Sequence, residues 1–304
     1  MALEVLANTL PRGVTASEPE RSRLNGSLDL DFRRGSASGR TALVRSSQIP
    51  PLRVVRAFAQ EDGAALAHLH NVSGGVLGGD RLVLRAQVGP GACVQITTTG
   101  ATRIYRPRSD APVALQINQI VVDEDGLLEY VPDPIIPFAG ARFSQRTTIQ
   151  LAEGAGLFWW EILAPGREAC GEIFEYERVE LITDVFAAGR RIAAERLRLE
   201  PGSGDLGSLA RLGDYRYLAS FYICRAGLGA SAWLAAEEHL REVARGITRP
   251  RETVWGISAL TADGLAARCL ARRGRDAISG LRAIWEAAKL LLYGRQAIPP
   301  RKVN

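Results

Sequence analysis

Lysine, histidine and cysteine are scarce in this chain of 304 residues, and each scarcity weakens the case for a class of function. Lys289 and Lys302 are the only lysines, and no Gly-x-x-x-x-Gly-Lys-Ser/Thr sequence occurs, which excludes a P-loop nucleotidase. There are three histidines and no Gly-x-Ser-x-Gly elbow, so candidate bases for a serine or cysteine nucleophile are few. The sequence therefore gives little support for either kind of hydrolase.

The four cysteines are too far apart in the sequence for a Cys-x-x-Cys metal or redox motif. They are typical of buried thiols in a reducing compartment. The N-terminus lacks the basic and apolar regions of a signal peptide, and no run of about 18 apolar residues occurs. We therefore expect a soluble, cytoplasmic protein without a membrane span.

Charge and composition set broad limits on partners and domains. The net charge is +5, but the basic residues, nearly all arginine, are scattered singly, so we predict no nucleic-acid partner. With 46% hydrophobic residues the chain can bury a large core. Residues 1–23 show no periodicity and are predicted to be a disordered leader, which leaves a single β-rich domain over residues 24–304.

Apolar and polar residues alternate through most of the chain, which predicts β-strands. Residues 81–88 and 92–98 form two such strands, and Gly89-Pro90-Gly91 predicts a tight turn between them. Similar small turns before a new strand recur at residues 123–126 and 152–156, which indicates strands stacked coil upon coil. Further strands are predicted at residues 27–32, 40–45, 52–58, 64–71, 113–122, 127–131, 157–163, 177–183 and 194–199.

Helical periodicity is confined to the last quarter of the chain. One helix is predicted from Ser231 to about Arg245, with an apolar stripe of Leu234, His239, Leu240 and Val243, and Gly246 closing it. A second amphipathic stripe runs over residues 281–292 and ends at Gly294. The predicted fold is therefore mainly β, an irregular, β-helix-like coil of strands with about two C-terminal α-helices.

Three positions have residue types that could carry chemistry. Asp80 follows four glycines in six residues, where its carboxylate either projects into a gap or caps a strand. Glu161 shares a strand face with Trp159, so it either pairs with an arginine or lines a wet interior passage. His68 and His70 share one face and are either two nickel or zinc ligands or ordinary polar strand residues.

Pairs of Asp or Glu facing across a groove of a β-coil would also suit a carbohydrate-active enzyme. This β-helix-type enzyme is the alternative to a binding or scaffold protein. The sequence does not show which carboxylates would form a pair.

A series of motifs runs in order from about residue 27 to the C-terminus, and together they resemble the urease accessory protein D family, called UreD or, in some bacteria, UreH. Agreement over so many motifs in the same order is specific to one family. The motifs are Gly39–Arg45, Gly74–Asp80, Gly89–Ala92, Thr97–Arg106, Leu128–Pro132, Ile136–Ala141, Trp160–Glu172, Leu281–Trp285 and Pro300–Arg301.

The resemblance implies a non-catalytic scaffold that joins the accessory protein UreF and the GTPase UreG and docks on apo-urease. It also implies a symmetric hetero-oligomer, a β-rich coil with an internal passage for nickel, and no tightly bound cofactor, since nickel is held only transiently. On this basis we predict a metal path that includes Asp80, Glu161, Glu172 and His70. Partner-binding or structural roles are predicted for Gly78, Gly79, Thr97, Thr98, Arg103 and Tyr105.

Two departures from the family pattern affect these expectations. Many bacterial members have a Gln-Glu pair after the proline at Pro132, where this chain has Asp133-Pro134. The usual final aromatic residue is replaced by Lys302-Val303-Asn304. The first departure affects the role expected for a carboxylate directly after Pro132. The second affects the contact expected between the C-terminal tail and a partner protein.

Overall fold

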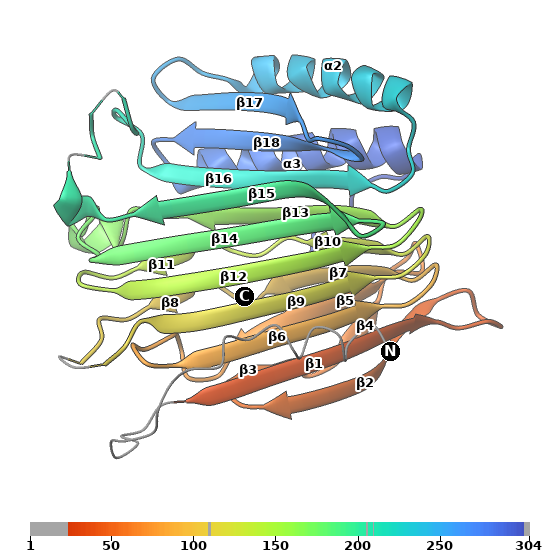
Figure 1. Ribbon diagram of the computed structural model, residues 1–304, viewed down its shortest axis with the longest axis horizontal. Coiled ribbons are helices and arrows are strands. Elements are labelled where there is room, and N and C mark those ends of the chain that lie inside the picture. The colour runs from red at the N-terminus through yellow and green to blue at the C-terminus, as the bar shows by residue number, and fades with distance from the viewer. Residues whose placement is uncertain (1–23, 109–110, 205, 209, 301–304) are drawn as a thin grey trace.

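The computed structural model describes residues 24–108, 111–204, 206–208 and 210–300, so the predicted leader and the altered tail lie outside the described residues. Two large sheets face each other in this part of the chain (Figure 1). The front sheet has the strand order β15 (Arg190–Leu199), β14 (Arg178–Ala187), β12 (Arg142–Leu151), β9 (Ala114–Val122), β6 (Arg81–Val88), β1 (Asn25–Arg34) and β2 (Thr41–Ile49).

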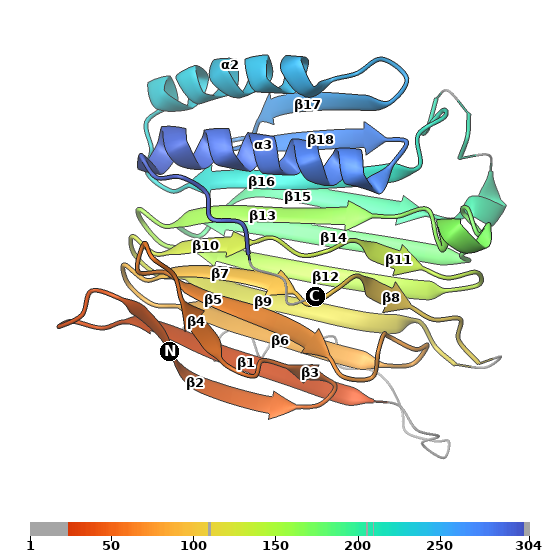
Figure 2. The ribbon, with the colours of Figure 1, turned by 180° about the vertical axis from the view of Figure 1, so that it is seen from behind.

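The back sheet lies behind the front sheet and is seen directly in Figure 2. Its main order is β17 (Thr253–Ala259), β18 (Gly264–Ala271), β16 (Tyr217–Arg225), β13 (Gly156–Leu163), β10 (Leu127–Tyr130), β7 (Cys93–Thr98), β5 (Ala65–Asn71) and β3 (Leu52–Arg53). Three short strands extend it, namely β4 (Ala57–Ala59), β8 (Thr102–Ile104) and β11 (Ile135–Pro137).

The centre of the molecule is a parallel coil that alternates between the sheets. The chain passes from β6 to β7, from β9 to β10 and from β12 to β13, each time crossing from the front sheet to the back sheet. Pairing is parallel through β1, β6, β9, β12 and β14 in front and through β5, β7, β10 and β13 behind. Antiparallel strands continue the sheets on either side of this coil. The predicted β-helix-like fold class is confirmed.

The recurring small turns form the corners of this coil and stack on one another. In each corner one residue has a positive φ, and these are Gly91 at 61°, Asp125 at 54° and Gly154 at 71°. The Gly91 amide donates to the Glu124 carbonyl over 2.9 Å, and the Asp125 amide donates to the Glu153 carbonyl over 3.1 Å. The corners are therefore joined by backbone hydrogen bonds, which explains why the turn repeats although its side chains change.

Two α-helices cover the outer face of the back sheet (Figure 2). Helix α3 (Gly274–Tyr293) ends at Gly294, which has a φ of 62°, as predicted from the sequence. Helix α2 (Ala230–Ile247) is longer than the predicted helix at both ends. Its N-cap is Gly229 rather than Ser231, and its C-cap is Thr248 rather than Gly246. Two short 3-10 turns, Glu168–Cys170 and Pro201–Ser203, follow β13 and β15.

The apolar stripe predicted for α2 was right at Leu240 and Val243 and wrong at Leu234 and His239. Leu240 is buried and Val243 packs against the core, but Leu234 is 67% exposed and His239 is exposed. The helix also buries Trp233, Ala236 and Ala244. Trp233 offers more apolar area than Leu234, so its burial sets the rotation of the helix. No helix in the described ranges is long and apolar enough to cross a membrane.

Two apolar cores result from this layering. The larger lies between the sheets, where Trp159 stacks on Tyr130 with ring centroids 3.9 Å apart. The smaller lies between the back sheet and the helices, around Trp160 and Trp285. Strand β13 is buried along its whole length because it belongs to both cores.

Candidate functional site

Polar side chains interrupt the apolar core between the sheets along one line that crosses the strands. Asn118, Thr147, Thr183 and Glu195 are successive register partners on β9, β12, β14 and β15. The Asn118 amide donates to Thr147 Oγ1 over 3.0 Å. We use the term polar row for these four residues together with Gln116, Gln145, Glu161 and Ser220.

Glu161 reaches the polar row from β13 in the back sheet. The Gln145 amide and the Thr183 hydroxyl both donate to its carboxylate, the latter over 3.4 Å. Burial, and secondarily the charge of Glu195, raise the pKa of Glu161 from 4.5 to about 7. Near neutral pH this carboxyl group is therefore partly protonated, and its hydrogen-bond partners are neutral groups rather than an arginine.

Glu195 on β15 lies at the far end of the polar row. Its carboxylate accepts hydrogen bonds from Ser220 Oγ over 2.8 Å and from the hydroxyl of Tyr222. The guanidinium of Arg268 lies 3.4 Å from the same carboxylate, and its side chain is 53% exposed. Glu195 thus connects the buried end of the row to an arginine at the surface.

Glu161 and Glu195 line one small cavity between the sheets. Its volume is about 20 Å³, which is room for roughly one water molecule or ion. A sugar ring cannot enter such a space, so the carboxylate pair does not favour the carbohydrate-active alternative. The lining residues are Glu161, Leu163, Leu181, Thr183, Glu195, Leu197, Leu218 and Ser220.

The opposite end of the polar row opens into a pocket of about 240 Å³. Gln116 connects the polar row to this pocket. It lines the pocket, and its side-chain amide donates to Asn118 Oδ1 over 3.2 Å. His70, Thr98 and Arg103 line the same pocket. Burial, and then the neighbouring His68, lower the pKa of His70, which keeps this imidazole neutral and able to accept a proton or a metal.

The atoms of the polar row that could ligate a metal ion are almost all oxygen atoms. In the described ranges, no three residues among His, Cys, Asp and Glu are grouped as a metal site would require. Two carboxylates with hydroxyl and amide groups suit weak, exchangeable binding of a divalent ion better than permanent storage. The geometry therefore fits weak binding of one small polar species at the cavity between Glu161 and Glu195.

Comparison with known proteins decides the family. A family model described as UreD urease accessory protein matches residues 24–304. This chain belongs to the UreD family. A relative from Herpetosiphon aurantiacus, named urease accessory protein UreD, is 44% identical over 92% of this chain and 97% of its own length. A UreD from Pseudomonas fluorescens is 32% identical over 91% of this chain and 94% of its own.

Asp80, in the first glycine-rich UreD motif, has both carboxylate oxygens hydrogen-bonded to the backbone. The amides of Leu77 and Leu24 donate to it over 2.9 Å and 3.4 Å. These bonds close the turn before β6, where Gly79 has a φ of 90° and a Cβ on Gly78 would lie 2.3 Å from Pro107. Asp80 does not line the cavity of the polar row, and its place in a metal path stays a prediction.

Glu172 lies in the loop after β13, also away from the cavity. Its carboxylate forms an ion pair with Arg167 and accepts a hydrogen bond from the Ala139 amide over 3.1 Å. The Arg167 guanidinium in turn lies over the ring of Phe138, 4.4 Å from its centroid. Glu172 thus has a clear structural contact here, and its predicted role in the path stays a prediction.

The threonines and Tyr105 of the motif Thr97–Arg106 form hydrogen bonds to neighbouring turns of the coil. Thr97 Oγ1 donates to the Val131 carbonyl over 2.7 Å, and Thr98 Oγ1 accepts a hydrogen bond from the Asp133 amide over 2.8 Å. The hydroxyl of Tyr105 donates to the Gly74 carbonyl over 3.1 Å. Asp133 therefore contacts the coil below it and is partly buried.

Glu195 is the functional candidate that the sequence reasoning missed. It lies in a strand that was predicted, on the face shared with Ala193 and Leu197. A single carboxylate among inward-facing apolar residues was the available signal. The neighbouring arginines at 196 and 198 concealed it, because they make the strand look uniformly charged.

Proposed function

We propose that this UreD-family chain is a non-catalytic scaffold in urease maturation. It joins a UreF-like accessory protein and a UreG-like GTPase to apo-urease in a symmetric hetero-oligomer of the cytoplasm. Membership of the urease accessory family supports this role, and so does the lack of a P-loop in the sequence, which leaves GTP hydrolysis to a partner.

Nickel, as cargo, passes along the polar row during this maturation. The observation that carries the proposal is the small cavity in which Glu161 and Glu195 face the same space. Their oxygens provide two successive weak ligands, and the raised pKa of Glu161 makes nickel and a proton compete for one carboxylate near neutral pH. Such competition favours release as well as capture.

Coexpression of a urease gene cluster with variants of this chain tests the path. We expect Glu161→Gln and Glu195→Gln each to lower the nickel content and activity of the purified urease by about tenfold. Each substitution replaces a charged carboxylate ligand by a neutral amide. Glu180→Gln is the matched control, because Glu180 lies on β14 but contacts Ser144 on the outer face. Full nickel loading with both interior variants would show that nickel does not use the polar row.

The scaffold role is tested separately by copurification. Wild-type chain and the Glu161→Gln variant should both retain UreF-like, UreG-like and urease subunits on a tagged column. Loss of all partners in the variant would point to unfolding rather than a blocked path. Failure of the wild-type chain to retain any of them would contradict the scaffold role itself.

A further inference from the structure

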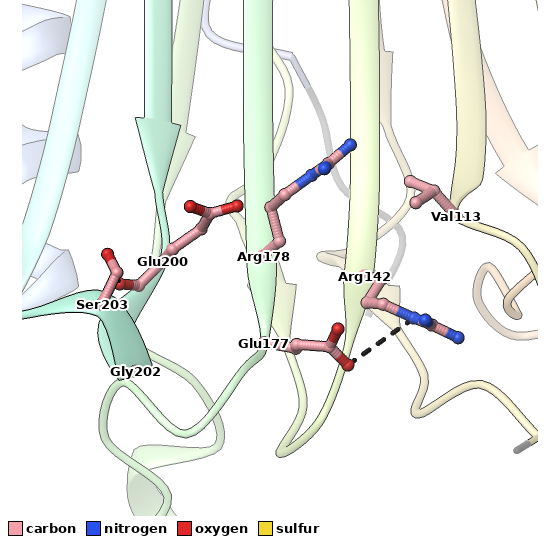
Figure 3. A pocket seen from close by; sticks show the side chains of 7 residues that line it. All are labelled: Val113, Arg142, Glu177, Arg178, Glu200, Gly202 and Ser203. Carbon is pink, nitrogen blue, oxygen red and sulfur yellow. Dashed lines mark hydrogen bonds and ion pairs between the residues drawn. The ribbon is translucent and has the colours of Figure 1, made fainter.

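A second polar site lies on the outer face of the front sheet, where β9, β12 and β14 begin and β15 ends (Figure 3). It is a pocket of about 370 Å³. Phe143 and Val179 point into the core, so their neighbours Arg142 and Arg178 point outward, away from the polar row. The lining residues are Val113, Arg142, Glu177, Arg178, Glu200, Gly202 and Ser203.

Two arginines stand side by side on neighbouring strands at the base of this pocket, with their guanidinium groups extending in different directions (Figure 3). Arg142 on β12 and Arg178 on β14 are direct register partners. Like charges directly opposite each other on neighbouring strands destabilise a sheet unless something compensates for them. The pocket therefore needs negative charge close to both guanidinium groups.

Only part of that need is met by the described residues. Arg142 Nη2 donates to the Ala111 carbonyl over 2.6 Å, and its Nε lies 3.7 Å from Glu177. Glu200 forms an ion pair with Arg198 at 2.7 Å. Two arginines and two glutamates thereby form ion pairs, although Arg142 Nε has no hydrogen-bond partner, and among the arginines that line the pocket Arg178 is left without an ion pair in the described ranges.

Arg178 has no side-chain hydrogen bond or ion pair within the described ranges, and its Nε is buried without a partner. Figure 3 shows its side chain extending from β14 toward β12, with the Glu200 carboxylate on its other side. A buried, unpaired donor on a charged group costs free energy that an acceptor of suitable shape would recover. The open space beside it gives room for such an acceptor.

We propose that this pocket binds a carboxylate group, with the guanidinium of Arg178 as its counter-charge. A guanidinium presents a planar fork of donors that matches the two oxygens of a carboxylate. A phosphate carries up to two negative charges near neutral pH, and Glu177 and Glu200 would repel the second one. One free positive charge thus selects a singly charged ligand. The carboxylate belongs either to a small organic acid or to an acidic side chain of a protein.

Titration of the full-length ¹⁵N-labelled chain tests this assignment. Arginine Nε–Hε signals are followed by NMR while acetate, an acetylated and amidated peptide with a single Glu, or inorganic phosphate is added. The Arg178 signal is the one that disappears in Arg178→Gln. We expect acetate and the peptide to shift it saturably, and phosphate to bind about tenfold more weakly or not at all. Tighter binding of the peptide would identify a protein side chain as the ligand, and tighter binding of acetate a free acid.

Three variants make the test decisive. In Arg178→Gln, acetate binding is followed by the Nε–Hε signal of Arg142, which lines the same pocket, and it should weaken by about tenfold or more because the charged donor is removed. Arg146→Gln on β12 removes an exposed arginine of the same sheet face outside the pocket and should leave binding unchanged. Glu200→Gln frees the charge of Arg198 and should strengthen acetate binding and admit phosphate. Unchanged binding in Arg178→Gln, or equal binding of phosphate and acetate by the wild-type chain, would overturn the proposal.

Discussion

Replacing Glu161 by Gln should change the pH dependence of stability in a direction that the interior geometry fixes. The carboxyl group has a pKa of about 7 in the folded chain against 4.5 as its ordinary value. Between these pH values the folded state binds more protons than the unfolded state, so the free energy of unfolding falls as pH rises. The contribution is fully present below pH 4.5 and is lost as pH rises through 7.

The size of this loss follows from the shift. A difference of about 2.5 pKa units corresponds to about 3 kcal/mol at 1.36 kcal/mol per unit. Gln stays neutral at every pH and keeps an oxygen that can accept the hydrogen bonds from Gln145 and Thr183. Glu161→Gln should therefore resemble the wild-type chain near pH 4.5 and exceed its stability by up to about 3 kcal/mol at pH 8.

Urea denaturation at pH 5, 6, 7 and 8, followed by tryptophan fluorescence, measures this difference. The change Glu180→Gln removes a carboxylate from the outer face of the front sheet and is the control for losing one negative charge outside the core. If the gap between Glu161→Gln and the wild-type chain is the same at pH 5 and pH 8, the carboxyl group is not desolvated and the reasoning fails.

Two further predictions concern stability, each measured by urea denaturation. Lys289→Met leaves Glu129 buried without the ammonium that lies 2.7 Å away, and should cost about 3–5 kcal/mol, most of it recovered in the double variant with Glu129→Gln. Gly166→Ala should cost more than Gly189→Ala. Both have positive φ, which costs about 1–2 kcal/mol for a side chain, but only at Gly166 would a Cβ meet a backbone atom, the Glu172 carbonyl oxygen at 2.6 Å. Equal costs for the two glycines would show that the loop after β13 gives way freely.

The strands and the coil could be predicted because their signals are local. Alternation identifies a strand face from a few residues, and the turn at Gly89-Pro90-Gly91 recurs because each corner needs a residue that tolerates positive φ. The phase of α2 could not be read with the same certainty, since Trp233 and Leu234 are adjacent apolar residues and only the packing surface chooses between them.

The interior site could be predicted only in part. Glu161 stood out because a carboxylate alternates with Trp159, and the structure places it beside a small cavity, while its part in a passage stays a prediction. Its partners Gln145 and Thr183 come from other strands of the opposite sheet, and no sequence pattern pairs residues across two sheets. Asp80 shows the reverse case, where the same glycine-rich context serves a buried turn equally well.

The polar row runs across the strands rather than along them, so its extent depends on how many times the chain winds. Asn118, Thr147, Thr183 and Glu195 occupy four neighbouring strands, and each step adds about 4.8 Å. Lengthening a strand would leave this span unchanged, whereas gaining or losing one whole winding would alter it by a single step. The distance between the His70 pocket and the Arg268 surface is therefore set by the number of stacked strands, of which β9, β12 and β14 belong to successive windings and β15 to the hairpin that follows them.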